Sequence, residues 1–331
     1  MKTVCITGCT GQTGSYLCER LLNDYKVYGL MRKSSSFNTE RINHIFNHPN
    51  LELMYGDLTD GSNITNWIAK CKPDYFFNLG ALSHVKVSFD QPLYTLNADA
   101  GGVINCLEAI RLHSPNTRFL HAGTSEQFGS SSPPQSEKTE MAPQSPYGVS
   151  KLAAYWLVRN YREGYGLFAC SSISFNHESK KRSPTFVTGK ICRGAARIKC
   201  GLQNELVLGN LKAKRSWNHV SDIIDGMLLM INAEKPDDYV IGSNKMISVE
   251  EFAEKVFSKL GMDWKDYVKV SEKYFRPNEV PNLEPDSTKI RTELGWTPKY
   301  SLDDIINEML DEHMRLAKQE VLLKEEKLDE R

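Results

Sequence analysis

Two short segments near the middle of the chain carry the side chains best suited to chemistry. The first is Thr124-Ser125-Glu126, and the second runs from Tyr147 to Lys151 with a Tyr-x-x-x-Lys spacing. Side chains four residues apart project from one face of a helix, so the Lys ammonium would lie beside the Tyr phenol. We expect the ammonium to stabilise the phenolate and to lower its pKa from the ordinary value of about 10. The pair would then act as a base that takes a proton from a hydroxyl while a hydride leaves the same carbon.

Glu126 supplies a second base, which an enzyme that only transfers a hydride does not need. An enzyme that oxidises one carbon and then removes the proton from the next carbon does need it. Each segment also has a structural alternative, because the triplet could cap a helix with a solvated Glu, and the Tyr–Lys spacing arises by chance in many helices. Their joint occurrence after a phosphate-binding loop favours a catalytic group of Thr124, Glu126, Tyr147 and Lys151.

The first 175 residues alternate between apolar runs and helix-like stretches. The runs have the length and character of strands that are buried on both faces of a parallel sheet. We predict strands at residues 4–7, 26–30, 51–55, 75–79, 118–122 and 168–172, and helices at residues 15–23, 64–71 and 146–161. This alternation predicts the α/β class with a Rossmann-type, doubly wound parallel sheet.

The pattern changes after residue 175, where basic or polar loops and shorter elements follow, with one more apolar pair at residues 222–231 and 239–241. We predict a smaller C-terminal substrate domain that is interleaved with the last elements of the sheet. The predicted cofactor domain covers residues 1–175 and about 216–246, and the substrate domain covers residues 176–215 and 247–310. Residues 311–331 are rich in Glu, Lys and Leu and are predicted to form a charged helical tail, either solvated or in contact with another subunit.

A glycine-rich loop joins the first predicted strand to the first predicted helix. Its glycines allow a tight turn and the close approach of a pyrophosphate, and the helix N-terminus offers free N–H groups and a positive partial charge. A glycine string alone is weak evidence, but the strand before it and the helix after it indicate a dinucleotide site. The predicted contacts are Gly8, Thr10, Gly11, Gln12, Thr13 and Gly14.

The end of the second predicted strand distinguishes between the two nicotinamide cofactors. An NAD site has an Asp or Glu here to hold the ribose 2′-hydroxyl. This chain instead has Arg32, followed by one Lys and three Ser, which suits a 2′-phosphate, although a basic surface turn is the alternative. We therefore predict NADP. Asp57 and Leu58 would bracket the adenine, and Leu79 and Ala81 lie where the fourth strand ends beside the cofactor.

Composition argues against several other classes of function. The 331 residues are 40% hydrophobic and 25% charged, as in an ordinary soluble domain, and their zero formal net charge indicates no bulk attraction to nucleic acid or membrane. No apolar run reaches the roughly 18 residues of a membrane span, and no signal peptide precedes the first strand. The eight Cys form no Cys-x-x-Cys pair, so we expect reduced thiols and a cytoplasmic protein. His44 and His48 have no third ligand nearby, so no metal site is predicted.

Ten sequence motifs are similar to those of one known family. With the glycine loop, the Tyr-x-x-x-Lys segment and the chain length, they identify the chain as similar to the GDP-mannose 4,6-dehydratases of the extended short-chain dehydrogenase/reductases. The resemblance runs from residue 3 to about residue 298. It rests on GCTGQTGSYL, RKSSSFNTERI, YGDLTD, NLGALSHVKVSFD, GTSEQFG, SPYGVSK, FNHES, FVTGKI, LGNLKAKR and YFRPNEV.

The resemblance implies a reaction and a role for each matching position. Tyr147 would deprotonate the C4 hydroxyl of GDP-mannose as NADP accepts the C4 hydride, with Thr124 near O4. Glu126 would remove the C5 proton as the C6 hydroxyl leaves, and the hydride would return to C6. The product would be GDP-4-keto-6-deoxymannose and water, which makes the protein a hydro-lyase.

The resemblance also implies binding residues and an assembly. Ser83 and Ser125 would line the sugar, and the residues implied for the cofactor are Ser83, Tyr94, Lys151, His177 and Arg182. Those implied for the nucleotide-sugar are Asn176, Lys190, Arg215, Arg276 and Glu279, with a surface salt bridge as the rival interpretation. The chain would form a homodimer or homotetramer through helices near residues 97–112 and 147–162, and the loop of residues 34–41 would bridge dimers.

The chain departs from the family pattern in the predicted substrate region. Two Lys at positions 180–181 replace the usual Pro-Arg, Ser216 and Asn218 replace the usual Asp and Gly, and Pro-Asn at 281–282 follows the RPNEV-type string. These departures leave open another GDP-hexose, such as a 2-acetamido sugar. A reductase or epimerase of the same fold is a further alternative, although it would leave Glu126 idle. A non-catalytic NADP-binding module is disfavoured because the Tyr, Lys and Glu are all present.

Overall fold

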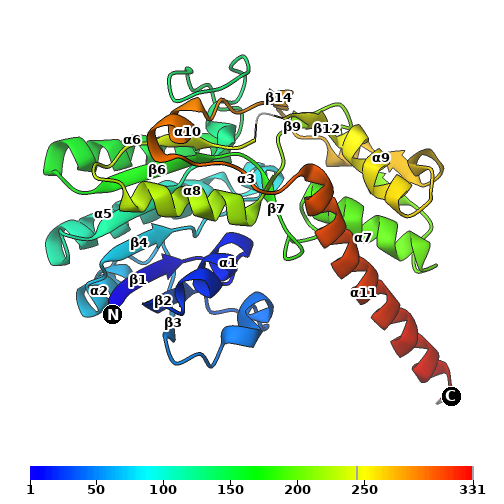
Figure 1. The fold of residues 1–331 in the computed structure, drawn as a ribbon, viewed down its shortest axis with the longest axis horizontal. Helices are drawn as coiled ribbons and strands as arrows, with labels where there is room; N and C mark the ends of the chain where they lie inside the picture. The colour runs from blue at the N-terminus through cyan, green and yellow to red at the C-terminus, as the bar shows by residue number, and fades with distance from the viewer. Residues whose placement is uncertain (244, 330–331) are drawn as a thin grey trace.

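A seven-stranded parallel sheet forms the centre of the larger part of the molecule (Figure 1). The computed structural model describes residues 1–243 and 245–329, so residue 244 and the last two residues of the predicted tail lie outside it. In spatial order the strands are β11 (Tyr239–Ile241), β6 (Ala169–Ser174), β5 (Arg118–Ala122), β4 (Tyr75–Asn78), β1 (Lys2–Thr7), β2 (Tyr25–Met31) and β3 (Leu51–Tyr55). Every residue of β4 and β6 is buried, as expected for central strands covered on both faces.

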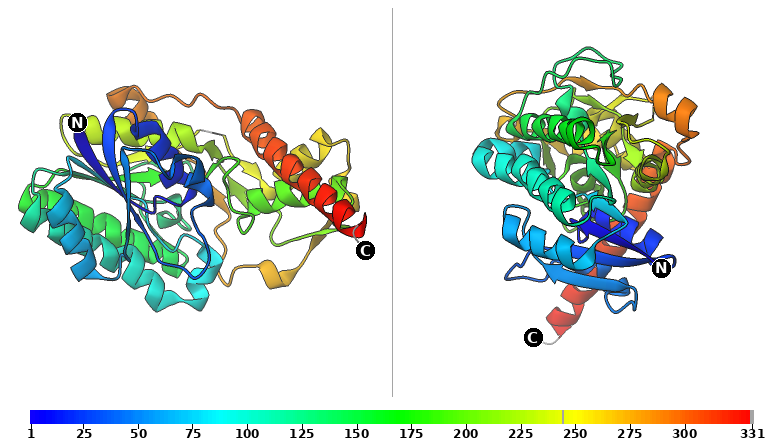
Figure 2. Two further views of the ribbon diagram at one scale, coloured as in Figure 1. Left: turned by 90° about the horizontal axis from the view of Figure 1, so that it is seen from below. Right: turned by 90° about the vertical axis from the view of Figure 1, so that its left-hand side faces the viewer.

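Helices cover both faces of this sheet (Figures 1 and 2). On one face lie α1 (Gln12–Leu21), α8 (Val220–Asn232) and α10 (Thr288–Leu294). The other face carries α2 (Gly61–Cys71), α5 (Gly102–His113) and α6 (Pro146–Tyr165). Leu17 and Met227 belong to the first apolar core, and Ile68, Leu107 and Val158 belong to the second. The sheet is therefore doubly wound, which confirms the predicted fold class.

The order in which strands are added to the sheet reverses at β1, because β2 lies on one side of β1 and β4 lies on the other. Ligands of open α/β sheets bind at such a switch point, beyond the carboxyl ends of the strands. Two short helices and a π-helical turn follow β4 at this end: α3 (Val85–Asp90), α4 (Pro92–Leu96) and η2 (Asn97–Gly101). The short 3-10 helices η1 (Glu40–Ile45) and η3 (Ser125–Gln127) follow β2 and β5 at the same edge.

A smaller part of the chain packs beside the carboxyl ends of the sheet (Figure 2). Its core lies among α7 (Val187–Lys199), α9 (Val249–Lys259) and the long helix α11 (Leu302–Asp329), and it includes Trp217, Phe252 and Met309. Its strands form three small sheets: β8 (Leu206–Leu208) with β13 (Val268–Val270); β7 (His177–Glu178) with β10 (Asn218–His219); and β12 (Ile247–Ser248), β9 (Lys214–Arg215) and β14 (Asn282–Leu283). The 3-10 helices η4 (Trp264–Asp266) and η5 (Glu272–Tyr274) flank β13.

Several helix boundaries differ from the sequence prediction by a few residues, and two of them are informative. Helix α1 begins at Gln12 rather than at residue 15, because the glycine loop already enters the helix. The predicted tail begins inside α11, which starts at Leu302 and buries Ile305 and Met309 in the smaller core. Beyond residue 311, Ala317 is still buried, so this stretch is not a wholly solvated tail. The division into two domains stays a prediction.

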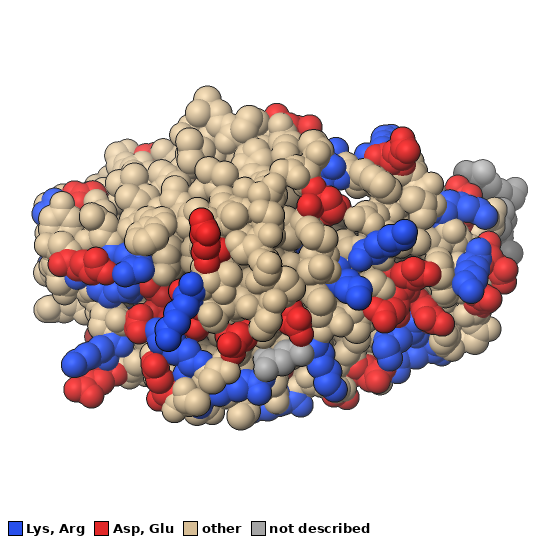
Figure 3. Space-filling view, turned by 90° about the horizontal axis from the view of Figure 1, so that it is seen from above, with Lys and Arg blue, Asp and Glu red and all other residues tan. Residues whose placement is uncertain are grey.

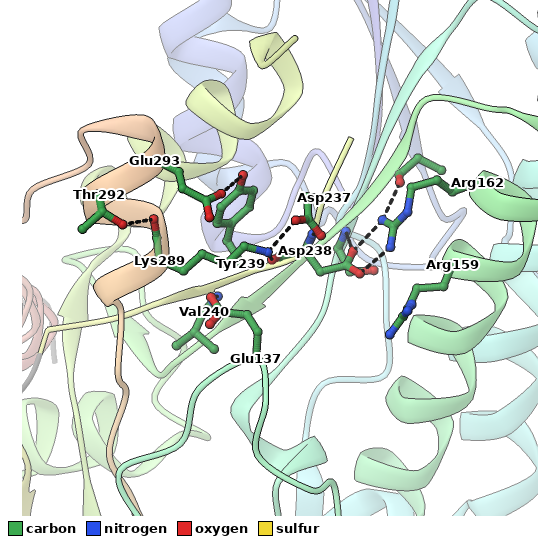
Figure 4. Close-up of polar contacts among 12 residues, drawn as sticks. Glu137, Arg159, Arg162, Asp237, Asp238, Tyr239, Val240, Lys289, Thr292 and Glu293 are labelled. Atoms are coloured by element: carbon green, nitrogen blue, oxygen red, sulfur yellow. Dashed lines mark hydrogen bonds and ion pairs between the residues drawn. The ribbon is translucent and has the colours of Figure 1, made fainter. Parts of the chain in front are cut away.

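Charged side chains hold the edge strand β11 in place (Figure 4). Arg162 of α6 pairs with Asp238 at 2.7 Å, and Lys289 of α10 pairs with Asp237 at 2.6 Å. The Glu137 carboxylate accepts a hydrogen bond from the Val240 N–H at 2.7 Å. This side chain thus satisfies a backbone donor that an unprotected sheet edge would expose. On the face seen in Figure 3, acidic and basic side chains are interspersed along the rim, and no single-sign patch forms there.

Candidate active site

One cavity of about 1180 Å³ lies between the carboxyl ends of the sheet and the smaller part of the chain. Every residue that the sequence analysis assigned to catalysis, cofactor or substrate lies on its wall, from the glycine loop to Glu279. A volume above the range of a single small-ligand pocket suits a dinucleotide and a nucleotide-sugar side by side. The structure therefore brings together all predicted site residues, while their individual roles stay predictions.

The glycine loop has the shape that a pyrophosphate needs. Gly8 adopts φ +69°, a left-handed conformation that favours glycine, and the Gly11 N–H donates to its carbonyl at 2.9 Å. A Cβ at Gly14 would lie 2.2 Å from that same carbonyl, so no side chain fits there. No side chain caps the N-terminus of α1, which leaves its first N–H groups for an anion. The residues present thus fit a dinucleotide cofactor.

Strand β7 and the residue that follows it are fastened to the start of α1. The Gln12 amide donates to the His177 carbonyl at 2.9 Å, and the Ser179 hydroxyl donates to the Gln12 side-chain oxygen at 2.9 Å. His177 Nδ1 lies 2.9 Å from the Phe175 carbonyl, so this nitrogen carries the proton and Nε2 accepts from the Thr13 hydroxyl. Burial lowers the pKa of His177 from 6.5 to about 4, and its imidazole is therefore neutral at neutral pH.

The wall beyond β2 combines a predicted and an unpredicted cation. Arg32 Nη1 donates to the Tyr94 hydroxyl at 2.8 Å, which joins two residues predicted for the cofactor. Arg41 lies on the same wall and donates from Nε to the Lys181 carbonyl at 2.9 Å. The sequence analysis placed Arg41 only in a bridging loop. Its place after the Arg-Lys-Ser run was the available signal for a second cation near the expected ribose 2′-phosphate.

The end of β5 is braced by a side chain that the sequence analysis did not assign. Thr124 caps η3, and the Gln127 side chain accepts the Thr124 N–H at 3.0 Å in a capping box. The same Gln127 donates to the Lys151 carbonyl at 3.1 Å, so one buried amide joins the two segments predicted to be catalytic. The signal was the Thr-x-x-Gln spacing itself, which is that of a capping box.

Tyr147 and Lys151 are both buried at the start of α6. Ser145 caps this helix by accepting the Gly148 N–H at 3.0 Å, and the Tyr147 N–H donates to the Ser88 hydroxyl at 3.2 Å. Lys151 Nζ donates to the Ala122 carbonyl at 2.9 Å, and no direct bond joins it to the phenol in the described chain.

The predicted lowering of the Tyr147 pKa is wrong for this structure. Burial raises the pKa of the phenol above its usual range, and the Asp99 carboxylate raises it further, while a hydrogen bond with Thr124 acts in the opposite direction. Burial also lowers the pKa of Lys151, with Asp99 opposing that shift. The spacing placed both groups on one helix face, but it carried no information about how deeply they are buried.

Glu126 lies in a cluster of four charged side chains. Its Oε1 is 3.3 Å from Arg276 Nη1 and 3.9 Å from Arg215 Nη2, and Glu279 Oε1 is 3.6 Å from both guanidinium groups. The other oxygen, Oε2, is buried and has no hydrogen-bond partner among residues 1–243 and 245–329. The Arg215 side chain is only 6% exposed, which rules out the surface salt bridge as its explanation.

Lys190, a further nucleotide-sugar candidate, lies beside the segment that follows β13. Lys190 Nζ lies 3.8 Å from the centre of the Tyr274 ring, and Lys86 Nζ donates to the Phe275 carbonyl at 3.0 Å. Tyr274 and Lys86 also line the cavity and were not predicted. The positively charged wall suits a diphosphate.

The departures at positions 216 and 218 act on the backbone of the site. The Asn218 amide donates to the Asn176 carbonyl at 2.8 Å, and the Ser216 hydroxyl donates to the Ser243 carbonyl at 2.7 Å. Both side chains are buried, and neither lies on the described cavity wall. They therefore hold the backbone at Asn176 and Ser243 and do not line the cavity.

Other classes of site find no support in the described structure. Residues 1–243 and 245–329 contain no group of three His, Cys, Asp or Glu side chains that could hold a metal ion. Within the same residues, no helix combines the length and the apolar character that crossing a membrane requires. All eight Cys are free thiols.

Comparison with known proteins gives one consistent result. The profile of a family described as GDP-mannose 4,6 dehydratase matches residues 5–309. The chain is 50% identical to GDP-mannose 4,6 dehydratase 2 of Arabidopsis thaliana, with 97% of this chain and 89% of that protein covered. It is 43% identical to GDP-mannose 4,6 dehydratase of Homo sapiens, with 95% and 91% covered. Its fold is similar to the crystal structure of dTDP-glucose 4,6-dehydratase from Bacillus anthracis in complex with NAD, with a TM-score of 0.84, 22% identity, and 95% and 97% covered.

Proposed function

The chain belongs to the GDP-mannose 4,6-dehydratase family and has the hydro-lyase activity of that family, and we propose how its own residues divide the reaction, with NADP as the cofactor. The activity converts GDP-D-mannose to GDP-4-keto-6-deoxy-D-mannose and water. The observation that carries the proposal is one cavity wall on which Thr124, Glu126, Tyr147 and Lys151 lie between a glycine loop and a cluster of cations. A reductase, an epimerase and a different GDP-hexose are not favoured.

We assign the cofactor as NADP rather than NAD. The glycine loop and the N-terminus of α1 would hold its pyrophosphate, and Arg32 would bind the 2′-phosphate from the end of β2. Asp57 and Leu58 would flank the adenine. Held by these residues, NADP would supply the hydride acceptor for oxidation at C4 and the hydride donor for reduction at C6.

Tyr147 and Thr124 act at the first carbon. Tyr147 would take the proton of the C4 hydroxyl, and the Thr124 hydroxyl, which lies on the same cavity wall, would orient O4. Because burial raises the pKa of Tyr147, the phenolate requires a compensating positive charge. Lys151, one helical turn away, supplies it.

Glu126 acts at the second carbon. Once C4 is a ketone, the C5 proton is acidic, and the carboxylate of Glu126 would remove it and pass it to the C6 hydroxyl, which leaves as water. The proton that later returns to C5 would come from solvent. The unpartnered Oε2 is the oxygen available for the proton taken from C5. Ser83 and Ser125 would contact the sugar, and His177 and Arg182 would contact the cofactor.

The cations that surround Glu126 would bind the nucleotide. Arg215, Arg276 and Lys190 suit the diphosphate, and Glu279 suits a ribose hydroxyl or a base N–H. Asn176 would complete this contact from its position under Asn218.

We also propose that the chain forms a homodimer or homotetramer in the cytoplasm. Helices α5 and α6 expose the large apolar side chains of Ile104, Leu112, Val149 and Trp156, an arrangement that a second copy would cover. Trp156→Glu should shift the protein toward monomers in analytical ultracentrifugation. A wild-type protein that is already monomeric at micromolar concentration would contradict the assembly.

Incubation with GDP-mannose in deuterated water tests the proposed function. We expect a product that is lighter by one water and carries deuterium at C5, with catalytic NADP and no net formation of NADPH. A product without deuterium at C5 would mean that Glu126 does not act as the C5 base.

A further inference from the structure

Lys151 is a buried ammonium group that lacks a direct counter-ion. It is 2% exposed, and its Nζ donates to the Ala122 carbonyl at 2.9 Å. Among the described residues no carboxylate makes a direct ion pair with it. An ammonium buried without a compensating negative charge costs several kcal/mol and tends to lose its proton instead. Because the proposed mechanism needs Lys151 charged, another group must keep the proton on it.

Asp99 is a buried carboxylate on the neighbouring π-helical turn η2. It is 1% exposed, and its Oδ1 accepts the Leu82 N–H at 2.7 Å. Its Oδ2 is buried without a hydrogen-bond partner in residues 1–243 and 245–329. Turn η2 packs against α6, the helix that carries Lys151. The site thus contains one buried cation and one buried anion, each only partly satisfied by backbone groups.

Each of these two groups acts on the pKa of the other. Burial raises the pKa of Asp99 to about 6, and Lys151 is the first cause that opposes this rise. For Lys151, Asp99 is the charge that opposes the lowering of its pKa by burial. The two groups therefore stabilise each other's charged forms through space.

We propose that Asp99 is the counter-ion of Lys151 and a positioning residue for the reaction. Its carboxylate keeps the Lys151 ammonium charged beside Tyr147, and its bond to Leu82 holds the loop that carries Ser83 against the same cavity. This inference rests on the proposed function, in which Tyr147 takes the first proton with the help of Lys151.

Tyr94 and Glu108, two other ionisable groups around η2, bond to different partners, and Tyr147 is the exception. Helices α4, α5 and α6 pack against this turn. On α4, Tyr94 bonds Arg32, and on α5, Glu108 bonds Arg111. On α6, Tyr147 feels the Asp99 charge, which raises its pKa.

Strand β5 contributes one further group near Lys151. His121 is fully buried, and its pKa lies well below its usual range because of burial and the Lys151 charge. It is therefore neutral and cannot replace Asp99 as a counter-ion. Asp99 remains the negative charge that acts on the pKa of both Lys151 and Tyr147.

The substitution Asp99→Asn tests this role without changing the size of the side chain. Asn keeps an oxygen for the Leu82 N–H and removes the charge. Because that charge raises the pKa of both Tyr147 and Lys151, we expect both limbs of the pH profile of kcat to move to lower pH, by about one unit. Asp90→Asn is the matched control, because Asp90 is exposed at the end of α3 and should leave both limbs in place.

The outcomes separate the inference from the proposed function. A profile that only falls in height, with both limbs unmoved, would overturn the role of Asp99. A wild-type protein that does not dehydrate GDP-mannose would instead overturn the proposed function.

Infrared spectroscopy provides a second test that needs no turnover and remains available if Asp99→Asn does not fold. In Lys151→Met, Asp99 loses its counter-ion and should bind a proton near neutral pH. We expect a protonated carboxyl band that is absent from the wild type and from the double variant Lys151→Met/Asp99→Asn. If Lys151→Met shows no such band, Asp99 is not the counter-ion.

Discussion

Arg276 Nη1 lies 3.3 Å from Glu126 Oε1, although the two residues are 150 positions apart in the chain. The pair joins the carboxylate proposed to take the C5 proton to a guanidinium proposed to bind the diphosphate. Arg215 approaches the same carboxylate oxygen at 3.9 Å. The diphosphate of the nucleotide and the Glu126 carboxylate would therefore compete for the same two guanidinium groups. Nucleotide binding would release Glu126 from its ion pairs.

Removing this competition should strengthen nucleotide binding. We expect Glu126→Gln to bind GDP about three- to tenfold more tightly than the wild type, which corresponds to roughly 1 kcal/mol for one partly buried ion pair. Calorimetric titration of the NADP-bound protein measures the affinity. Glu52→Gln is the control, because Glu52 on β3 pairs with Lys70 of α2 and does not line the cavity. An unchanged or weaker affinity in Glu126→Gln would show that the pairing does not oppose GDP.

Variants that lack one of the two proposed bases should stop at different steps of the reaction. Glu126→Gln should slow dehydration by about 10²–10⁴-fold while still oxidising C4, because Tyr147 is intact. Rapid mixing with GDP-mannose should then show one burst of reduced nicotinamide absorbance. Tyr147→Phe should show no burst. Full turnover in Glu126→Gln would remove Glu126 from the mechanism.

Arg32 should determine the choice between the two nicotinamide cofactors. Its guanidinium lies on the cavity wall beside Tyr94, where an NAD site would have a carboxylate. We expect Arg32→Ala to weaken NADP binding by about tenfold or more and NAD binding much less, as measured by fluorescence titration. Lys26→Ala, on the same strand but bonded to the Pro49 carbonyl, should change neither affinity. Equal weakening of both cofactors would argue against recognition of the 2′-phosphate.

His177 should make the stability of the cofactor-free protein depend on pH. Its pKa is about 4 in the folded protein and 6.5 ordinarily, so the unfolded chain binds a proton first as the pH falls. The stabilisation is present above about pH 6.5 and is lost as the pH falls toward 4, with about 2 kcal/mol lost between about pH 7 and pH 5. Urea unfolding of His177→Gln should show a smaller loss over this interval. His113→Gln, at an exposed position, should lose as much as the wild type. Identical slopes for His177→Gln and the wild type would contradict this contribution.

Much of the fold could be predicted because the buried strands are recognisable in the sequence as apolar runs. The strands at residues 51–55 and 118–122 have the predicted bounds, and the other central strands differ only at their ends. Helix ends were harder, because the start of α1 depends on a backbone turn and the start of α11 depends on packing against the smaller core.

The site was predictable where it follows strand ends and hidden where it depends on distant contacts. Thr124 and Glu126 lie after β5, as the rule for open α/β sheets requires. The contact between Arg276 and Glu126 has no local pattern, since it forms only when the smaller part packs over the sheet. The raised pKa of Tyr147 likewise depends on burial, which residue spacing does not report. For Asp99, the available signal was a single acidic residue within a short run of small and apolar residues.

The fate of the hydrogen at C4 tests the central claim most directly. GDP-mannose deuterated at C4 should be incubated with the protein and a catalytic amount of NADP in ordinary water, and the product examined by NMR. The account predicts that the deuterium appears in the C6 methyl group of GDP-4-keto-6-deoxymannose. A methyl group free of deuterium, or a label that remains at C4, would contradict it.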